Sequence, residues 1–153
     1  MLFLAILVGR LISALTRLLK LGGGSAAPGL YALKIYPELV EGLASKIPRN
    51  IVITGTNGKT TTARMLAHFA KSEGLRVIRN TTGSNLERGI ASTLISHFPL
   101  HPSIGIWELD EAAFNSVAPK LKPDLVVFLN LSRDQLDRYG EIDSVLNNWK
   151  QTL

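Results

Sequence analysis

Four short apolar runs alternate with helical patterns in the sequence from Asn50 onward. Short apolar runs are typical of strands buried in a sheet, and here they cover 50–54, 75–79, 103–107 and 124–129. Apolar side chains between and after them recur at helical spacing, which predicts helices over 59–73, 87–98, 112–118 and 141–153. Strands that alternate with helices form right-handed βαβ units, so the pattern predicts an α/β fold with a parallel sheet flanked by helices.

The first 21 residues show a different pattern, with leucines on one side of a helix and polar residues on the other. The apolar side holds Leu4, Leu7, Val8, Leu11, Leu15, Leu18 and Leu19, and the polar side holds Arg10, Ser13, Arg17 and Lys20. The cations argue against a membrane-spanning helix, and a signal peptide would carry its positive charge before the apolar run. We predict an amphipathic helix over residues 1–21 that rests either on the protein or on a membrane surface.

A glycine-rich break, Gly22 to Gly29, separates this helix from a second helical pattern over 30–46 that Pro37 kinks or interrupts. Three consecutive glycines can cradle a substrate phosphate, but we interpret them as a linker. Three parts are therefore expected: an amphipathic helix (1–21), a linker with a lead-in helix (22–49) and a larger α/β domain (50–153).

The first predicted strand leads into Thr-Gly-Thr-Asn-Gly-Lys-Thr-Thr-Thr, residues 54–62. A strand, a glycine turn and a Lys-Thr pair that opens a helix are typical of a phosphate-binding loop. Glycines let the backbone approach the phosphates, and free N–H groups at the helix N-terminus attract them. Lys59 would reach the β- and γ-phosphates, and the Thr60 hydroxyl would coordinate Mg²⁺. Ile53 departs from the Walker pattern, which has a glycine at this position.

Polar residues also follow the later predicted strands: Asn85, then Glu108, Asp110 and Glu111, and finally Asn130. The carboxyl ends of parallel strands share one edge of a sheet, so these residues are expected beside the phosphate-binding loop. A carboxylate that closes an apolar strand there is suited to hold Mg²⁺, and we expect Glu108 to do so. Asp110 and Glu111 are alternative ligands or caps of the following helix.

The composition narrows the possible functions. Apolar residues make up 46% of the chain and charged residues 19%, which fits a globular protein. There is no cysteine, so these residues hold no disulfide or cysteine-ligated zinc, which fits a reducing cytoplasm. Of the net charge of +5, +4 lies before Asn50. A basic patch with interleaved aromatics is missing, which argues against nucleic-acid binding, and the basic end fits an anionic membrane or a lipid-linked pyrophosphate.

The motifs resemble those of one enzyme superfamily. Residues 54–62 resemble the ATP-binding loop of the Mur ligases and folylpolyglutamate synthases, in which a glycine at the place of Ile53 is normally absent. Segments 22–29, 82–89, 107–114 and 130–141 are similar to the MurT family, the ligase-like subunits of lipid II isoglutaminyl synthases. Asp134-Gln135 stands where amino-acid-adding Mur ligases usually carry Asp-His, which favours the MurT family. The resemblance covers essentially the whole chain and implies the Mur ligase middle domain for residues 50–153.

The resemblance also implies a set of site residues. Lys59 and Glu108 would act in catalysis, and Thr60 and Glu108 would hold Mg²⁺. The implied nucleotide-binding residues are Gly55, Thr56, Asn57, Gly58, Lys59, Thr60, Thr61, Asn85, Asn130, Asp134 and Gln135.

The reaction implied by the resemblance is the ATP- and Mg²⁺-dependent phosphorylation of the D-glutamate α-carboxylate of lipid II. Ammonia from a separate GatD-type glutamine amidotransferase subunit would then attack the acyl-phosphate and give D-isoglutamine. Such enzymes also carry a zinc ribbon and a C-terminal domain that residues 1–153 lack. We therefore expect an N-terminal fragment that is inactive alone and belongs in the cytoplasm, at the inner face of the membrane if residues 1–21 bind there.

Two other functions remain open. One is a ligase that adds an amino acid, as other Mur ligases or folylpolyglutamate synthases do. The other is a non-catalytic nucleotide-binding module that regulates a partner.

Overall fold

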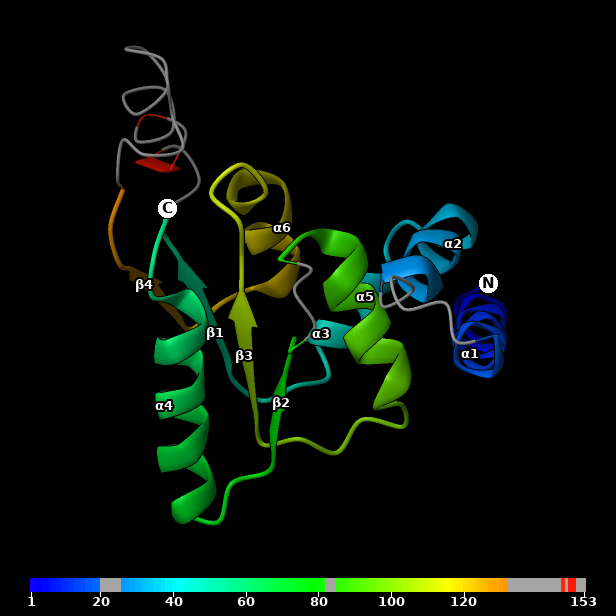
Figure 1. Cartoon of the computed structure of the whole chain (residues 1–153), viewed down its shortest axis with the longest axis horizontal. Helices are drawn as coiled ribbons and strands as arrows, with labels where there is room; N and C mark the ends of the chain where they lie inside the picture. Colours follow the sequence, from blue (N-terminus) through cyan, green and yellow to red (C-terminus); the bar gives the residue numbers. More distant parts are fainter. Residues whose placement is uncertain (20–25, 82–84, 132–146, 148, 151–153) are drawn as a thin grey trace.

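The centre of the molecule is a sheet of four parallel strands in the order β2-β3-β1-β4 (Figure 1). The computed structural model describes residues 1–19, 26–81, 85–131, 147 and 149–150. The strands are β1 (Asn50–Thr54), β2 (Val77–Arg79), β3 (Ile104–Glu108) and β4 (Leu125–Phe128). Ile53 of β1 lies opposite Glu108 on one side and Val127 on the other, so the end of β3 lies beside the turn after β1. The predicted α/β fold with a parallel sheet is confirmed.

The side chains of the two central strands pack to both faces of the sheet. On one face, Ile53 and Ile106 pack against Ala63 and Ala67 of α4 (Lys59–Ser72). On the other face, Val52 and Trp107 join the larger core, to which α3 (Leu39–Ala44), α5 (Glu87–Ser96) and α6 (Phe114–Leu121) contribute. Helices α1 (Leu2–Leu18) and α2 (Ala27–Ile35) lie beyond α5, on the far side of the molecule from α4 (Figure 1).

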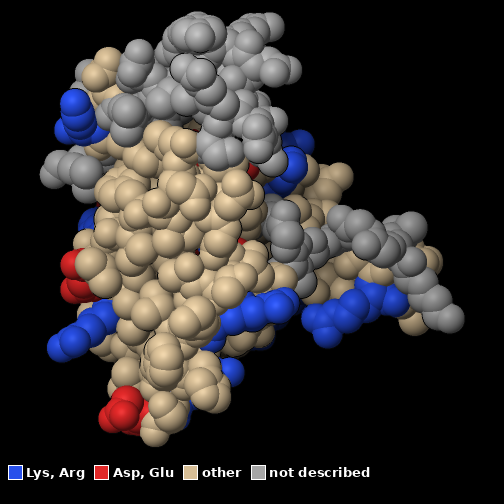
Figure 2. Space-filling model, turned by 60° about the vertical axis from the view of Figure 1, so that its left-hand side comes forward, with Lys and Arg blue, Asp and Glu red and all other residues tan. Residues whose placement is uncertain are grey.

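The edge strand β4 is only partly covered by the residues that the structure describes. Its Leu125 and Phe128 are 50% and 38% exposed. Figure 2 brings the side with α4 and β4 forward and shows a broad area without charged side chains, bordered by charged residues of both signs. Leu125 and Phe128 therefore leave apolar side chains partly exposed at this edge of the sheet.

Strand β1 has the predicted bounds, and five further elements begin and end within two residues of their predicted ranges: β2, β3, β4, α4 and α5. Such differences are usual at element ends. Gly74 directly follows the predicted end of α4 at residue 73; it has a φ of 76° and donates a hydrogen bond to the Lys71 carbonyl, as a glycine at the C-terminus of a helix commonly does.

Two predicted helices differ from the observed ones. The pattern over 30–46 forms α2 and α3 as separate helices, because Tyr36 before Pro37 is extended and ends α2. The break predicted over 22–29 is wrong in its last three residues, since α2 already begins at Ala27 with Pro28 in its first turn. The helix predicted to stop before Pro119 instead contains Pro119 and ends at Leu121. Burial of Val117 and Leu121 in the core offsets the one backbone hydrogen bond that proline cannot make. The helix predicted over 141–153 lies mostly outside the described residues.

Helix α1 packs on the protein, but not through its predicted leucine side. The side in contact consists of small and medium residues, Ala5, Ile6 and Gly9, which are buried. A Cβ on Gly9 would lie 2.8 Å from the Ile95 side chain, so this glycine allows a close approach to α5. The leucine side faces solvent, with Leu7 and Leu11 exposed by 65% and 60%. Among the described residues, no helix has the length and apolar character that crossing a bilayer requires.

Substitution of Gly29 tests the packing between α2 and α5. A Cβ on this residue would lie 1.9 Å from the Arg88 carbonyl oxygen and 2.7 Å from the Ser92 nitrogen, so backbone atoms would have to move. We expect Gly29→Ala to lower the free energy of unfolding by about 1–3 kcal/mol, as overpacking usually does. Urea unfolding of the purified full-length protein measures this change.

Gly42 of α3 provides the matched control, because it is also a helical glycine. A Cβ there would meet its nearest neighbour, the Tyr36 ring, only at 3.8 Å. Gly42→Ala should therefore raise the free energy of unfolding by about 0.4–1 kcal/mol, since alanine restricts the unfolded chain. Equal effects of the two substitutions would contradict the tight contact at Gly29.

Candidate nucleotide-binding site

The turn between β1 and α4 presents backbone groups at the edge of the sheet. Gly55 and Gly58 have φ values of 132° and 87°, which favour glycine. A Cβ on Gly55 would also lie 2.8 Å from the Asn130 carbonyl oxygen. Gly58 is the N-cap of α4, and no side chain caps this helix. The first N–H groups of α4 can therefore bind an anion, which the helix dipole also favours.

Lys59 opens α4, and its side chain folds back over the turn. Its Nζ donates hydrogen bonds to the carbonyl oxygens of Gly55 and Thr56, the latter at 3.2 Å. Nζ also lies 3.6 Å from Glu111 Oε2, and the two side chains are 13% and 18% exposed. The Lys59 ammonium is thus held over the turn that leads into α4, where a phosphate-binding loop carries its lysine. Sequence reasoning did not identify Glu111 as the partner of Lys59.

Glu108 ends β3 and directs its carboxylate toward the start of α4. Thr60 Oγ1 donates a hydrogen bond of 2.6 Å to Glu108 Oε2, so the two predicted metal ligands lie together. Glu108 is 3% exposed. A hydroxyl and a carboxylate are the hard oxygen ligands that Mg²⁺ prefers, and Mg²⁺ usually keeps waters and phosphate oxygens as its other ligands. Among the residues that the structure describes, no cluster of three or more His, Cys, Asp or Glu side chains could hold a metal ion.

Two residues at the end of β2 hold Glu108 in place. Asn80 donates a hydrogen bond to the Glu108 carbonyl oxygen and accepts one from the Glu108 N–H, both at 2.9 Å. Arg79 NH1 lies 3.5 Å from Glu108 Oε1, while the other carboxylate oxygen faces Thr60. Sequence reasoning missed both residues. An asparagine directly after an apolar strand was the available signal for Asn80, because the end of a parallel strand is where ligands bind.

Asn130 ties the end of β4 to the phosphate-binding turn. Its Oδ1 accepts from the Asn57 N–H at 2.9 Å, and its Nδ2 donates to the Asn57 carbonyl at 3.2 Å. Its own carbonyl accepts from the Thr56 N–H at 2.7 Å. The structure therefore places Asn130 as a support of the turn that Gly55, Thr56 and Asn57 form.

Of the four remaining predicted site residues, the structure describes Asn85 and Thr61. The Asn85 carbonyl accepts from the Asp110 N–H at 2.9 Å, so the loop after β2 reaches the end of β3. Thr61 lies exposed in the first turn of α4. Asp134 and Gln135 lie outside the described residues, and their roles stay predictions.

The predicted capping of the helix after β3 is wrong. The N-cap of α6 is Ala113, and no side chain bonds to it there. Asp110 Oδ1 instead accepts from the Ala112 N–H at 3.1 Å, within the turn before the helix. Glu111 pairs with Lys59, as described above.

A parallel sheet, a glycine turn with a lysine at the start of a helix, and a carboxylate on the adjacent strand define a nucleotide-binding domain of the P-loop type. Within this class, the profile of the Mur ligase middle domain matches residues 53–151. The chain belongs to the Mur ligase family, which confirms the resemblance seen in its motifs.

Individual proteins of the Mur ligase family show which of its members this chain is similar to. The chain is 36% identical over 130 residues to the MurT subunit of lipid II isoglutaminyl synthase (glutamine-hydrolyzing) from Staphylococcus aureus strain COL, covering 85% of this chain and 30% of that protein. It is 36% identical over 146 residues to MurT from Streptococcus pneumoniae strain ATCC BAA-255 / R6, covering 94% and 32%. It is also 38% identical over 104 residues to UDP-N-acetylmuramoylalanine–D-glutamate ligase from Caulobacter vibrioides strain NA1000 / CB15N, covering 67% and 20%.

A solved structure shows the same fold. MurF from Acinetobacter baumannii superposes with a TM-score of 0.60 over 76% of this chain and 26% of that one, at 20% sequence identity. The chain spans about a third or less of the length of the curated relatives it matches.

Proposed function

We propose that this chain supplies the ATP-binding middle domain of a MurT-type ligase subunit, which amidates the D-glutamate α-carboxylate of lipid II during peptidoglycan synthesis. This proposal is supported by how much of the chain is similar to MurT proteins. The middle-domain profile begins at residue 53, whereas the match to Streptococcus pneumoniae MurT covers 94% of the chain and so includes most residues before that point. The match to the D-glutamate ligase covers 67%. Lead-in and middle domain together therefore favour the MurT type over an amino-acid-adding ligase.

The proposed chemistry converts a poor electrophile into a reactive one. A carboxylate oxygen of the substrate attacks the γ-phosphorus of ATP, the bond from that phosphorus to the bridging oxygen breaks, and ADP leaves. Ammonia then attacks the carbonyl carbon of the acyl-phosphate, inorganic phosphate leaves, and the nitrogen loses a proton. The products are ADP, phosphate and the carboxamide.

In this scheme the described residues bind, position and neutralise charge. The N–H groups at the start of α4 and the Lys59 ammonium would bind the β- and γ-phosphates, while Thr60 and Glu108 would hold Mg²⁺. Bound Mg²⁺ would neutralise charge that develops on the phosphates. Asn80 and Arg79 keep the Glu108 carboxylate beside Thr60. Catalysis of this kind depends on orientation and electrostatic stabilisation, which such a site supplies.

The source of ammonia is part of the proposal. The MurT relatives are named as subunits of a glutamine-hydrolyzing synthase. We therefore propose that a GatD-type glutamine amidotransferase subunit hydrolyses glutamine for this ligase. Because the substrate is a lipid, the reaction would take place at the membrane, and its need for ATP would place it on the cytoplasmic side.

The test uses the full-length protein with ATP, Mg²⁺, lipid II and ammonia. We expect ADP release that requires both lipid II and ammonia, together with conversion of glutamate to isoglutamine in the product by mass spectrometry. Glutamine should replace ammonia only when the amidotransferase subunit is added. No ADP above background would leave only a nucleotide-binding role. Incorporation of a labelled amino acid, without any response to ammonia or glutamine, would assign the chain to the amino-acid-adding ligases.

A further inference from the structure

A stripe of leucines along α1 faces away from the protein. Its members recur every three or four residues and are exposed by between 47% and 78%: Leu4, Leu7, Leu11, Leu15 and Leu18. Single exposed apolar side chains are normal on protein surfaces, whereas a contiguous row of them marks an interaction site. The opposite side of α1 is already occupied, because Ala5, Ile6 and Gly9 are buried against the protein.

The charged side chains that α1 and α2 contribute beside this leucine stripe are all positive. The first acidic residue of the sequence is Glu38, so α1 and α2 contain none. Arg10 and Arg17 of α1 and Lys34 of α2 are exposed cations. Such a surface complements an anionic partner, and a basic helix with a leucine side is typical of helices that lie in the interface of an anionic membrane.

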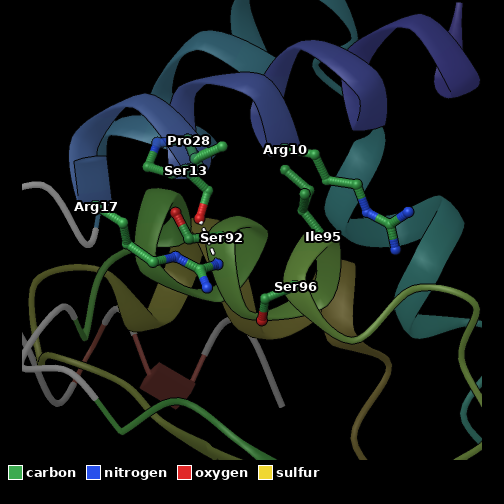
Figure 3. A pocket seen from close by; sticks show the side chains of 8 residues that line it. Arg10, Ser13, Arg17, Pro28, Ser92, Ile95 and Ser96 are labelled. Atoms are coloured by element: carbon green, nitrogen blue, oxygen red, sulfur yellow. Dashed lines mark hydrogen bonds between the residues drawn. The ribbon is translucent and has the colours of Figure 1, made fainter. Parts of the chain in front are cut away.

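A pocket with a volume of about 380 Å³ opens between α1 and α5. Two arginines and three serines contribute to its lining: Arg10, Ser13, Arg17, Ser92 and Ser96. Figure 3 shows the Arg17 side chain extending from α1 toward Ser92, and its guanidinium donates to Ser13 Oγ at 3.0 Å. Guanidinium and hydroxyl groups are strong donors to phosphate oxygens.

The pocket lies next to the leucine stripe on the surface of α1. Ala14 also lines the pocket, and it neighbours Leu11 and Leu18 at helical spacing. Side chains that can donate hydrogen bonds to a phosphate therefore lie directly beside apolar side chains that can contact acyl chains. A bilayer has the same arrangement, with phosphates at its surface and acyl chains below them.

We propose that α1 binds the surface of an anionic phospholipid bilayer, lying parallel to its plane. The leucine stripe would insert among the acyl chains, and a lipid phosphate would bind at Arg17 in the pocket. Arg10, whose guanidinium donates to the Phe98 carbonyl oxygen and extends away from Arg17 (Figure 3), would add positive charge beside the bilayer. The helix has 17 residues with Arg10 in its middle and Arg17 in its last turn, which suits a position in the interface. Ala5, Ile6 and Gly9 would keep α1 attached to the protein while its other side is in the membrane. This inference does not depend on the proposed ligase activity.

Co-sedimentation of the full-length protein with lipid vesicles tests the proposal. We expect binding to vesicles of phosphatidylcholine and phosphatidylglycerol that increases with the fraction of phosphatidylglycerol. The double variant Leu7→Glu/Leu11→Glu should weaken binding by at least about tenfold, because two carboxylates would enter the apolar stripe. Arg10→Gln/Arg17→Gln should weaken binding to the anionic vesicles by about tenfold to thirtyfold and leave binding to pure phosphatidylcholine unchanged.

The matched control is Met65→Glu/Phe69→Glu on α4. These residues have the same spacing as Leu7 and Leu11, and they are 54% and 58% exposed. We expect this variant to bind vesicles like the wild type. Circular dichroism and thermal unfolding should show all variants folded, and ADP release on detergent-dispersed lipid II should match the wild type for each, which separates membrane binding from the ligase activity.

Several outcomes would overturn the proposal. Absence of wild-type binding to anionic vesicles would do so, as would an equal loss of binding in the α4 control. If the wild type forms oligomers without lipid and Leu7→Glu/Leu11→Glu converts them to monomers, the leucine stripe covers a second copy instead. Binding that is indifferent to Arg10→Gln/Arg17→Gln would contradict the role of the pocket.

Discussion

Replacing Lys59 with alanine is expected to lower turnover of the full-length ligase by roughly 10²- to 10³-fold, the range seen when one preorganised electrostatic donor is lost. The Lys59 ammonium lies over the turn before α4, and in the proposed reaction the transferred phosphoryl group would carry negative charge beside it. Its loss should also weaken ATP binding, because the same cation contacts the ground-state phosphates. Steady-state ADP release and calorimetric titration with ATP measure the two effects separately.

Lys71 provides the control for this substitution. It is an exposed lysine in the last turn of the same helix. Lys71→Ala changes the net charge equally but removes nothing from the site, so its turnover should stay close to that of the wild type. Wild-type turnover in Lys59→Ala would exclude the assigned role.

Replacing Glu108 with glutamine should raise the Mg²⁺ concentration needed for half-maximal turnover by about 100-fold or more. Loss of an outer-shell partner alone typically costs about 10- to 100-fold in metal affinity or activity, and Glu108 is proposed to contact the metal directly. The fold should remain intact, because Asn80 binds the backbone of residue 108 rather than its carboxylate. The measurement is ADP release as a function of Mg²⁺ concentration.

Glu111→Gln is the matched control, since it also removes one carboxylate charge near the turn. Glu111 lies beside Lys59, whereas Glu108 accepts the hydrogen bond from Thr60. We therefore expect Glu111→Gln to leave the Mg²⁺ requirement unchanged. The reverse result, with an effect of Glu111→Gln and none of Glu108→Gln, would assign the metal to Glu111.

The strands and the phosphate-binding turn could be predicted from the sequence, because each depends on the residues within it. The buried strands β1 and β3 are short apolar runs in the sequence. The turn between β1 and α4 has positive φ values at Gly55 and Gly58, which glycine adopts more readily than other residues. The pairing of Thr60 with Glu108 could also be predicted, since parallel strands end at one edge of the sheet.

Features that depend on tertiary packing could not be predicted in this way. Arg79 and Asn80 contact Glu108 because β3 lies between β2 and β1, and hydrophobic alternation does not reveal strand order. Periodicity showed which residues share a side of α1, but not which side packs. The leucines form the more apolar side, yet Gly9 allows the closer approach to α5, and the small side is the buried one.

The claim on which the proposed function depends is that the turn between β1 and α4 binds a triphosphate while Thr60 and Glu108 hold its metal. A crystal structure of the full-length protein with Mg²⁺ and a non-hydrolysable ATP analogue tests this claim most directly. We predict β- and γ-phosphates at the N–H groups of α4 and at Lys59 Nζ, with Mg²⁺ between Thr60 Oγ1 and the Glu108 carboxylate. A nucleotide bound elsewhere, or a metal held without Glu108, would contradict it.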